Sequence, residues 1–324
     1  MKYRSLLITP ILLFLTVNAN AVIKDQIAVA AFIEKMHSKH QFDKTQLENL
    51  FASVETKKNI LKTIAAPAEA MAWHNYRKIF MTDTRISGGI KFWKENEQAL
   101  NSVAKKYGVP PEIIVAIIGV ETRYGHNIGH HRVVDALSTL GFSYPKRSQF
   151  FLRELESFLI LCRSEKLDPL QPTGSYAGAM GLPQFMPSSF LAYAVDFEDN
   201  NHRDIWNNPS DAIASVANYF AKHRWKTGEP IAFPVQAQGE NFKKALASDL
   251  KPDTTVAKLK KLNITTPETL TEDTQVKLFS FKQAASSDLW IGLHNFYVIT
   301  RYNHSPLYAM AVYQLSQAIL DKRN

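Results

Sequence analysis

Several features are missing or scarce in this 324-residue sequence, and each absence narrows the class of protein. Cys162 is the only cysteine, so the chain cannot form an internal disulfide. There are no internal repeats, low-complexity tracts or long linkers, which excludes a repeat architecture. No stripe of Lys and Arg interleaved with aromatic residues occurs, so nucleic acid is not the expected partner. The formal net charge of +8 instead suits some other acidic polymer.

The N-terminus has the features of a secretory signal. "MKYRSLLITPILLFLTVNANA" begins with Lys2 and Arg4, continues with an apolar segment from Leu6 to Val17, and ends in an A-x-A site. The alternative is a membrane anchor, but an apolar segment of about 12 residues is too short to span a bilayer comfortably. We therefore expect residues 1–21 to be a signal peptide that is cleaved after Ala21. No cysteine lies near the cut, which excludes a lipid-modified N-terminus.

The full sequence is 45% hydrophobic, and the part that follows the expected signal peptide has mostly the pattern of helices. "LENLFASVETKKNILKTIAA" and "KFWKENEQALNSVAKKYG" have apolar residues three and four positions apart. "PEIIVAIIGVET" is apolar nearly all round, which is typical of a central buried helix. Cys162 lies on the apolar face of "FLRELESFLILCRSEK", so we favour a buried structural thiol over a nucleophile. "EPIAFPVQ" and "TQVKLFSFKQ" predict short strands. The expected fold class is mainly α (α+β), with a small β-containing insertion.

Glu121 is the first candidate for chemistry. It ends the apolar helix in "IIGVETRYG", where the two preceding turns carry no charge. Desolvation disfavours an ionised carboxyl group and raises its pKa, as a general acid near neutral pH requires. The alternative is a structural carboxylate that pairs with Arg123 or another base.

A glycine-rich stretch, "GSYAGAMGLPQFMPSS", forms the second candidate. Its glycines allow the backbone to approach a ligand, its polar side chains offer directional contacts, and Phe185 and Met186 offer an apolar floor. A sugar needs this combination. The alternative is an ordinary turn before a helix that Ser188 and Ser189 cap. The residues concerned are Gly174, Gly178, Gly181, Ser175, Tyr176 and Gln184.

Four motifs occur in order: "PPEIIVAIIGVETRYG", "GSYAGAMGLPQFMPSS", "DAIASVANYF" and "NFYVITRYNHS". Together they resemble the membrane-bound lytic murein transglycosylase B family, a branch of the lysozyme-like superfamily, from about residue 25 to the C-terminus. The resemblance implies a helical domain from residues 22–95 and 285–324, and a lysozyme-like core from 96–229 with a loop at 196–211. Residues 230–284 would form the small β-containing insertion.

The resemblance also implies a reaction. Glu121 would protonate the oxygen between N-acetylmuramic acid and N-acetylglucosamine, then take the proton of the muramyl C6 hydroxyl as that oxygen attacks C1. The product is a 1,6-anhydro sugar, and no second carboxylate is needed. The polar loops hold none, and four nearby acids fit helix surfaces or boundaries: Asp135, Glu154, Glu156 and Asp168. The alternatives are a hydrolytic muramidase of the same fold, or a non-catalytic peptidoglycan-binding scaffold.

Other roles follow from the same resemblance. Ser175 and Gln184 would bind sugar near the acid, and Tyr76 would line the cleft. Tyr302 and Asn303, in "TRYNHS", would approach Glu121 from the C-terminal part. Lys146 and Arg147 form a basic pair in "YPKRSQ". The pair would bind carboxylates of the stem peptide; the alternative is that both are solvated charges on a loop. The implied protein is soluble and periplasmic, and its partner is the peptidoglycan glycan strand.

No organic cofactor is implied, and metal binding is where the sequence departs from its relatives. Some family members carry an EF-hand-like calcium loop, and "DFEDNNHRDIWNNPSD" occupies that position. Its ligands would be Asp196, Glu198 and Asn200. Asn201 stands where glycine is expected, and only a longer loop would reach Asp211, so any calcium site should be weak. Three histidines, His126, His130 and His131, are expected on a surface loop and not at a zinc ion.

Overall fold

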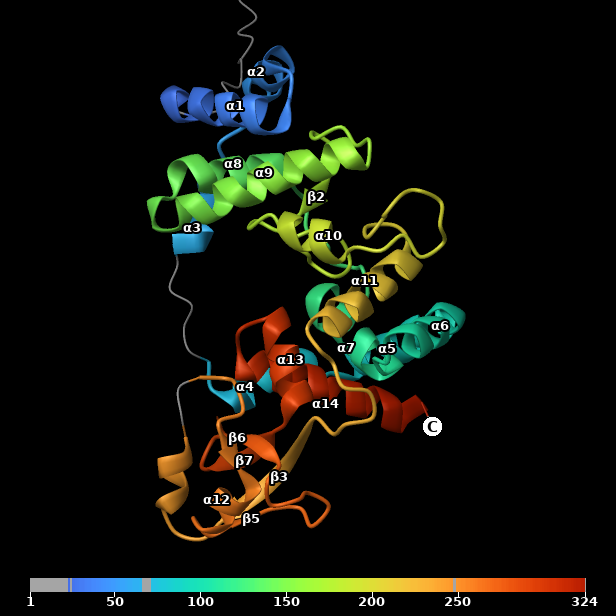
Figure 1. Ribbon diagram of the computed structural model, residues 1–324, viewed down its shortest axis with the longest axis vertical. Helices are drawn as coiled ribbons and strands as arrows, with labels where there is room; N and C mark the ends of the chain where they lie inside the picture. The colour runs from blue at the N-terminus through green and yellow to red at the C-terminus, as the bar shows by residue number, and fades with distance from the viewer. Residues whose placement is uncertain (1–22, 24, 66–70, 247–248, 324) are drawn as a thin grey trace, which may run out of the picture.

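The computed structural model describes residues 23, 25–65, 71–246 and 249–323 (Figure 1). The expected signal peptide, residues 1–21, lies outside them. The described chain contains fourteen α-helices and two short 3₁₀ helices. The first half holds α1 (Gln26–His40), α2 (Lys44–Ala52), α3 (Lys58–Ala65), α4 (Trp73–Phe80), α5 (Asp83–Glu95), α6 (Glu97–Tyr107), α7 (Pro111–Thr122), α8 (Val133–Ser143), η1 (Pro145–Arg147) and α9 (Ser148–Ser164). The second half holds α10 (Pro187–Tyr193), α11 (Pro209–Lys222), η2 (Asn241–Ala245), α12 (Val256–Lys260), α13 (His294–Tyr302) and α14 (Pro306–Arg323).

The helices form successive groups along the long axis of the molecule (Figure 1). At one end α1 and α2 lie on the long pair α8 and α9, and α3 contacts α8. The middle holds α5, α6, α7, α10 and α11. Near the other end α4, from the first third of the chain, contacts α14 from its last residues. The chain therefore brings α4 next to its last helix, which itself packs on α7. Among the described residues, no helix is long and apolar enough to cross a membrane.

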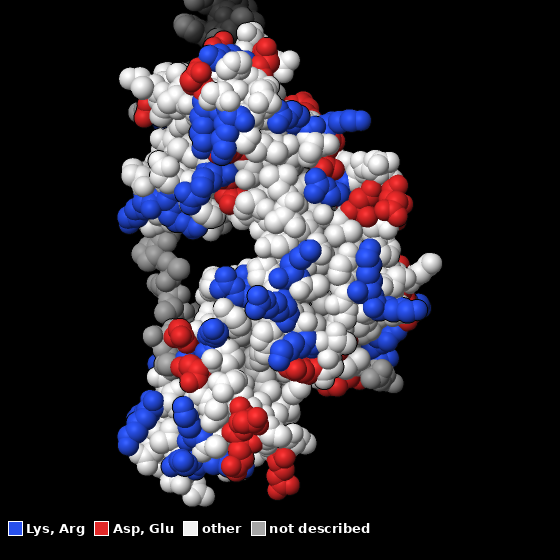
Figure 2. Space-filling view, viewed as in Figure 1, with Lys and Arg blue, Asp and Glu red and all other residues white. Residues whose placement is uncertain are grey.

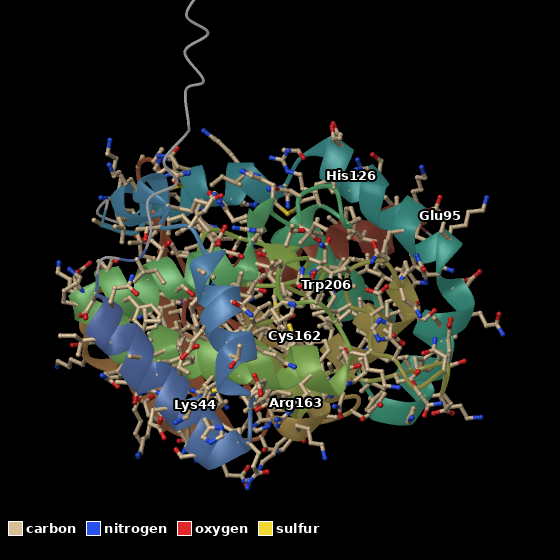
Figure 3. All side chains as sticks on the ribbon, turned by 90° about the horizontal axis from the view of Figure 1, so that it is seen from above. Lys44, Glu95, His126, Cys162, Arg163 and Trp206 are labelled. Carbon is tan, nitrogen blue, oxygen red and sulfur yellow. The ribbon has the colours of Figure 1, made fainter. Side chains whose placement is uncertain are left out.

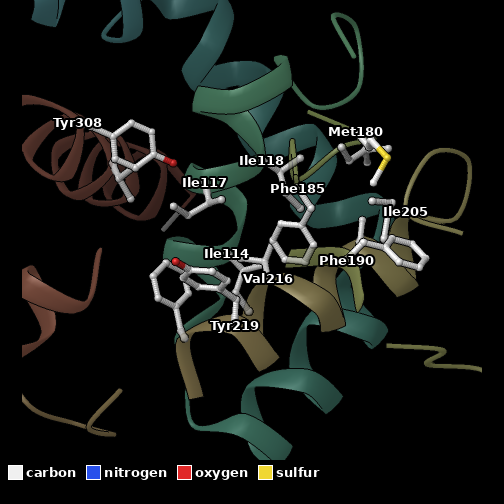
Figure 4. Packing of buried hydrophobic residues seen from close by; sticks show 14 of the residues in the cluster. Ile114, Ile117, Ile118, Met180, Phe185, Phe190, Ile205, Val216, Tyr219 and Tyr308 are labelled. Carbon is white, nitrogen blue, oxygen red and sulfur yellow. The ribbon is translucent and has the colours of Figure 1, made fainter. Parts of the chain in front are cut away.

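Helix α7 is the buried centre that the sequence predicts. It begins at Pro111, which suits a first helical turn because its missing N–H has no partner to lose there. Every residue from Ile113 to Gly119 is buried, and α5, α11 and α14 pack around the helix. Figure 4 shows Ile117 next to Tyr308 of α14, and Ile118 on the side of Phe185. Because α7 is packed on several sides, the position of a side chain in its last turn, such as Glu121, is well defined.

A five-stranded antiparallel sheet lies at the far end, in the order β4-β6-β7-β3-β5. Both predicted strands are present. The strands are β3 (Ala232–Ala237), β4 (Thr254–Thr255), β5 (Ile264–Thr265), β6 (Gln275–Lys282) and β7 (Ser287–Gly292). The sequence did not indicate β7, which follows β6 through a tight turn and extends the sheet beyond residue 284. One sheet face has a small core of its own around Leu278 and Ile291. On the other face Phe281 packs against Trp73 of α4, with ring centroids 5.4 Å apart.

Cys162 is buried in α9, as the sequence predicts. Burial raises the pKa of its thiol to about 12, and the nearby charge of Asp168 acts in the same direction. A thiol that stays protonated at neutral pH is a poor nucleophile. Figure 3 shows Cys162 well inside the molecule.

Candidate active site

Glu121 lies in the last turn of α7 and accepts a hydrogen bond from the side chain of Tyr308. The Tyr308 hydroxyl donates to Oε1 of Glu121 over 2.6 Å. Burial raises the pKa of Glu121 to about 7, and the Tyr308 hydrogen bond counteracts part of that rise. The residue is only partly exposed. Pairing with Arg123, the alternative raised by the sequence, is wrong: Arg123 is exposed, and no salt bridge to Glu121 occurs in the described part of the chain.

Three tyrosines from both ends of the chain surround this carboxyl group. Tyr302 of α13 lies parallel to Tyr308, with ring centroids 6.4 Å apart and planes 7° apart. Burial raises the pKa values of Tyr76, Tyr302 and Tyr308, and the charge of Glu121 raises each of them further. Tyr308 contacts the carboxyl group directly, Tyr302 stacks on Tyr308, and the charge effect on Tyr76 is consistent with a position close to them. The structure thus has Tyr302 and Tyr76 in the neighbourhood of Glu121.

Tyr308 is the site residue that the sequence reading missed. The helix "SPLYAMAVYQ" looks amphipathic, and Tyr308 is 2% exposed, so its pattern is that of a core residue. The available signal was its position in the first turn of a helix, directly after the "TRYNHS" motif. Asn303 lies one residue beyond α13 and is exposed. No side-chain hydrogen bond joins it to Glu121 within the described residues.

The glycine-rich stretch packs against the end of α7 and next to Tyr302. The Thr122 hydroxyl donates to Leu182 O over 3.1 Å, and the Tyr302 hydroxyl donates to Pro183 O over 2.7 Å. Gly181 has a positive φ of 64°, and a Cβ there would lie 2.4 Å from the carbonyl oxygen of Ile205. Close packing therefore requires this glycine. The loop is a fixed wall beside Glu121.

The two polar side chains expected to bind sugar also hold this wall together. Ser175 Oγ accepts hydrogen bonds from the backbone N–H groups of Ala177 (3.3 Å) and Ala179 (3.0 Å). Gln184 Nε2 donates to the carbonyls of Ile128 and Gly181 over 3.1 and 3.0 Å. Both residues are partly exposed. The hydroxyl proton of Ser175 and the carbonyl oxygen of Gln184 remain for a ligand.

Two local expectations for this stretch are wrong. Phe185 is no apolar floor; it is 2% exposed and packs under the loop against Tyr219. Ser188 does not cap α10 with its own side chain. Instead Glu154 of α9 accepts from the N–H of Ser188 over 2.9 Å and from its hydroxyl over 2.7 Å. A carboxylate at a helix N-terminus is favourable because it satisfies a free N–H and complements the helix dipole.

Each of the four other acids accepts hydrogen bonds or forms ion pairs with residues other than those around Glu121. Three of the four are buried, whereas the sequence placed all of them on helix surfaces or boundaries. Glu156 binds Lys35, Lys39 and His40 at 2.5–2.9 Å. Asp135 is fully buried, pairs with Arg132 at 2.8 Å and accepts from the N–H of Glu55. Glu154 accepts hydrogen bonds from Ser188, and the exposed Asp168 accepts from the N–H of Leu170. In the part of the chain that the structure describes, no carboxylate acts on the pKa of Glu121.

Lys146 and Arg147 lie in η1, between α8 and α9, and both are exposed. The Arg147 guanidinium lies over the rings of Phe150 and Phe151, 4.3 and 5.2 Å from their centroids. Figure 2 shows a hollow between the part of the molecule that carries α8 and α9 and the part that carries α13, with Lys and Arg side chains on both margins. Lys146 and Arg147 therefore lie in the group of helices on one side of this hollow.

The loop at residues 196–211 closes on its own hydrogen bonds. Asp196 accepts from the N–H groups of Asn200 and Asn201, and Asn201 has the left-handed φ of 65° that glycine would supply. Asp211 is fully buried, and its two oxygens accept from Phe197 N and Asp204 N, each over 2.8 Å. Both oxygens of the acid that would complete a calcium cage thus accept hydrogen bonds from the loop backbone. No group of three His, Cys, Asp or Glu suited to a metal occurs among the residues described.

The three histidines follow α7 closely in the chain. His126 and His130 are exposed, and the rings of His130 and His131 lie 4.5 Å apart. Figure 3 shows His126 at the periphery of the molecule. His126 and His130 belong to the loop between α7 and β1 (His131–Arg132), as the sequence predicts, and His131 is the first residue of β1. Strand β1 pairs with β2 (Thr173–Gly174) at the start of the glycine-rich stretch.

A helical core with one partly exposed carboxyl group of raised pKa, enclosed by tyrosines and a rigid polar loop, defines a glycan-cleaving enzyme of the lysozyme-like class. Residues 24–317 match the model of the transglycosylase SLT domain. The chain is 44% identical to membrane-bound lytic murein transglycosylase B of Escherichia coli strain K12 over 298 residues, 89% of this chain and 81% of that protein. The chain belongs to this family of lytic murein transglycosylases.

Solved structures agree with this relationship. The soluble lytic transglycosylase SltB1 from Pseudomonas aeruginosa is 49% identical and superimposes with a TM-score of 0.88, over 91% of this chain and 99% of that one. SltB3 from Pseudomonas aeruginosa, in complex with NAG-NAM-pentapeptide, is 27% identical with a TM-score of 0.82, over 92% of this chain and 80% of that one. The mainly α, lysozyme-like fold class that the sequence predicts is confirmed.

Proposed function

We propose that the protein cleaves the β-1,4 bond between N-acetylmuramic acid and N-acetylglucosamine in peptidoglycan, with Glu121 as the only acid and base. The observation that supports this most directly is the carboxyl group of Glu121, whose pKa burial raises to about 7 and which has no carboxylate partner in the described structure. A group with such a pKa can both give and take a proton near neutral pH. A related structure that holds a NAG-NAM-pentapeptide supports the same substrate class.

The reaction balances with one carboxyl group. Glu121 donates its proton to the bridging oxygen as the bond from that oxygen to the muramyl C1 breaks. The Glu121 carboxylate then accepts the proton of the muramyl C6 hydroxyl as its oxygen bonds to C1. The Tyr308 hydroxyl, 2.6 Å from Oε1, stabilises the carboxylate between the two steps. The product is a 1,6-anhydro sugar, and water is not consumed. In hydrolases of the usual kind a second carboxylate would activate water or attack C1.

The other site residues take supporting roles in this proposal. Tyr76, Tyr302 and Asn303 line the sugar site from the two chain ends, and Ser175 and Gln184 contact sugar hydroxyls from the glycine-rich wall. Lys146 and Arg147 meet the peptide part of the strand. Residues 1–21 direct export to the periplasm, where the substrate lies.

No metal enters the chemistry. The loop at residues 196–211 satisfies its own carboxylates, which supports at most weak calcium binding by Asp196, Glu198 and Asn200. Such an ion would brace the loop and would not act on Glu121.

Mass spectrometry of the soluble products from purified peptidoglycan tests the proposal. The wild type should release muropeptides that end in 1,6-anhydro-muramic acid, and Glu121→Gln should release none. Reducing ends one water heavier would identify a muramidase instead. Binding to the wall without release by the wild type would identify a scaffold.

A further inference from the structure

Arg85 of α5 binds the end of helix α7 with a buried guanidinium group. It is the only buried arginine in the described part of the chain, with 7% of its surface exposed. Its Nη1 donates to the carbonyl oxygens of Gly119 over 2.5 Å and of Val120 over 3.4 Å. The last carbonyls of a helix lack partners within the helix and carry a partial negative charge, so they compensate for the burial of a cation. These two carbonyls belong to the residues that directly precede Glu121.

Tyr124 contacts Arg85 from the other side of Glu121. Its hydroxyl donates to the backbone carbonyl of Arg85 over 2.8 Å. Arg85 therefore donates to the chain just before Glu121 and accepts from the chain three residues after it. Helices α5 and α7 lie side by side (Figure 1). We call these reciprocal contacts the Arg85–Tyr124 clasp.

Three glycines make room for the ring of Tyr124. A Cβ at Gly119 would lie 2.5 Å from the Tyr124 hydroxyl oxygen, and one at Gly89 would lie 2.7 Å from it. A Cβ at Gly88 would lie 3.0 Å from a carbon of the same ring. Glycine inside a helix costs stability relative to alanine, yet Gly88 and Gly89 are consecutive residues of α5. The close approach of Tyr124 accounts in part for both.

The backbone that follows Glu121 has an uncommon conformation. Arg123 and Tyr124 have left-handed φ values of 51° and 61°, which side chains with a Cβ rarely adopt. Their N–H groups donate to the carbonyls of Gly119 and Ile118 over 3.2 and 3.3 Å and so close the end of α7. Such a conformation persists only where its surroundings determine it, and it is concentrated at functional sites. The clasp supplies contacts on both sides of this turn.

The carboxyl group of Glu121 must meet the Tyr308 hydroxyl of another helix within hydrogen-bonding distance. A hydrogen bond of 2.6 Å weakens steeply when its geometry changes, so the last turn of α7 has to stay in place. The other titratable side chains near Glu121 are Tyr302 and Tyr76. Burial and the hydrogen bond from Tyr308 set the pKa of Glu121 in the described structure, and the charge of Arg85 is not among its causes. Arg85 therefore acts through the backbone of α7.

We propose that Arg85 and Tyr124 are positioning residues, which hold the last turn of α7 so that the Glu121 carboxyl group stays against the Tyr308 hydroxyl. Neither residue contacts the substrate in this proposal. The inference rests on the proposed function for the reaction that it supports. The contact that it concerns, however, is present in the protein without substrate.

A ¹³C NMR titration of the glutamate side-chain carboxyl groups tests the clasp in the free protein, with Glu121→Gln used to assign the signal. Arg85→Met removes the donors and keeps an apolar stem. It should raise the pKa of Glu121 by about one unit, because a weaker hydrogen bond from Tyr308 favours the ionised form less. Tyr124→Phe removes one hydroxyl and should shift this pKa in the same direction by less. An unchanged or lower pKa in the folded variants would overturn the inference.

Combining Arg85→Met with Tyr308→Phe separates positioning from other effects. Without the Tyr308 hydroxyl, the clasp has no hydrogen bond to preserve. Arg85→Met should then change the pKa of Glu121 by less than about 0.3 units relative to Tyr308→Phe alone. Equal shifts in both backgrounds would also overturn the inference, because Arg85 would then act on Glu121 without Tyr308.

Arg163→Met is the matched control. Arg163 of α9 also donates to a backbone carbonyl, that of His40 over 2.7 Å, and lies over the ring of Phe42, 4.1 Å from its centroid. Its replacement should leave the pKa of Glu121 unchanged. Circular dichroism checks folding, and if Arg85→Met does not fold, Tyr124→Phe decides alone.

Kinetics on a soluble NAG-NAM-pentapeptide tetrasaccharide give the second measurement. Arg85→Met should lower kcat on the order of tenfold or more and keep KM within twofold, because the acid is misplaced while the sugar contacts remain. A lower kcat with an unchanged pKa of Glu121 would mean that the clasp only supports the fold. The proposed function fails separately, if the active wild type releases no anhydro product, and the NMR result does not depend on it.

Discussion

Tyr308 and Glu121 are 187 positions apart in the sequence and are joined by a hydrogen bond of 2.6 Å. The bond connects the last helix of the chain to the helix at its centre. It also influences the pKa of the acid: burial raises this pKa, the hydroxyl counteracts part of the rise, and the result is about 7. Burial and the hydrogen bond are both needed for a pKa near neutral pH. An exposed carboxyl group would be ionised at pH 7, and a buried one without a hydrogen-bond donor would hold its proton too tightly.

Replacing Glu121 should abolish cleavage and stabilise the fold at high pH. We expect Glu121→Gln to lower kcat about 10³-fold or more, because both proton transfers are lost. Burial makes the folded protein hold this proton to about pH 7, whereas the unfolded chain releases it near its ordinary pKa of 4.5. The contribution of Glu121 to stability is therefore complete below pH 4.5 and is lost as the pH rises through 7.

The stabilisation by Glu121→Gln should thus be larger at pH 8 than at pH 5, by up to ~3 kcal/mol. Urea unfolding at the two pH values measures it. Glu268→Gln makes the same chemical change at an exposed position and should show no such difference. Equal effects of Glu121→Gln at both pH values would mean that its pKa is ordinary.

Removing the hydroxyl of Tyr308 should shift the pH profile of the enzyme. Glu121 must carry its proton to act as an acid, so kcat/KM should fall as the pH rises through its pKa. Tyr308→Phe removes a donor that stabilises the carboxylate, so the pKa should rise and the descending limb should move to higher pH. Tyr313→Phe on the same helix, whose hydroxyl contacts Ala232 O, is the control and should keep the wild-type limb. A limb that moves to lower pH in Tyr308→Phe would contradict this role.

Glu156 should stabilise the fold at neutral pH and lose this effect in acid. Burial alone would raise the pKa of Glu156, but Lys35, His40 and Lys39 bring it to about 2. Since the pKa is depressed in the folded state, its stabilisation is present above about pH 4.5 and disappears as the pH falls toward 2. Glu156→Gln should cost about 2 kcal/mol at pH 7 and much less at pH 3, measured by denaturant unfolding. Glu272→Gln, in an exposed pair with Lys260, should cost less than 1 kcal/mol, and an equal cost would contradict the account.

Calcium should have little effect. For a weak site with a millimolar Kd, a calcium concentration equal to that Kd stabilises the fold by only about 0.4 kcal/mol. Melting temperature and activity should therefore be nearly the same with EDTA and with millimolar calcium. A rise of several degrees, or activity that EDTA removes and calcium restores, would show that the loop at residues 196–211 holds a tighter site than its hydrogen bonds suggest.

What the sequence could predict is local. Helix α7 and strands β3 and β6 were readable because their apolar residues, prolines and β-branched residues lie within one short window. Glu121 was readable because its burial follows from the helix that carries it. The contacts that complete the site are not local: Tyr308 comes from the last helix, and Glu154 caps a helix more than 30 residues further on. The sequence around Tyr308 and around Glu154 has the pattern of an ordinary helix. Only the folded structure therefore shows which residue each of them contacts.

The account depends most on the muramyl C6 hydroxyl, and not water, closing the reaction at C1. Digestion of peptidoglycan in water enriched in ¹⁸O, followed by mass spectrometry of the released muropeptides, measures this directly. The account predicts anhydro-muramyl ends that contain no ¹⁸O. Muramyl reducing ends that carry one ¹⁸O atom would contradict it, because water would then have attacked C1 and a second group would have to activate that water.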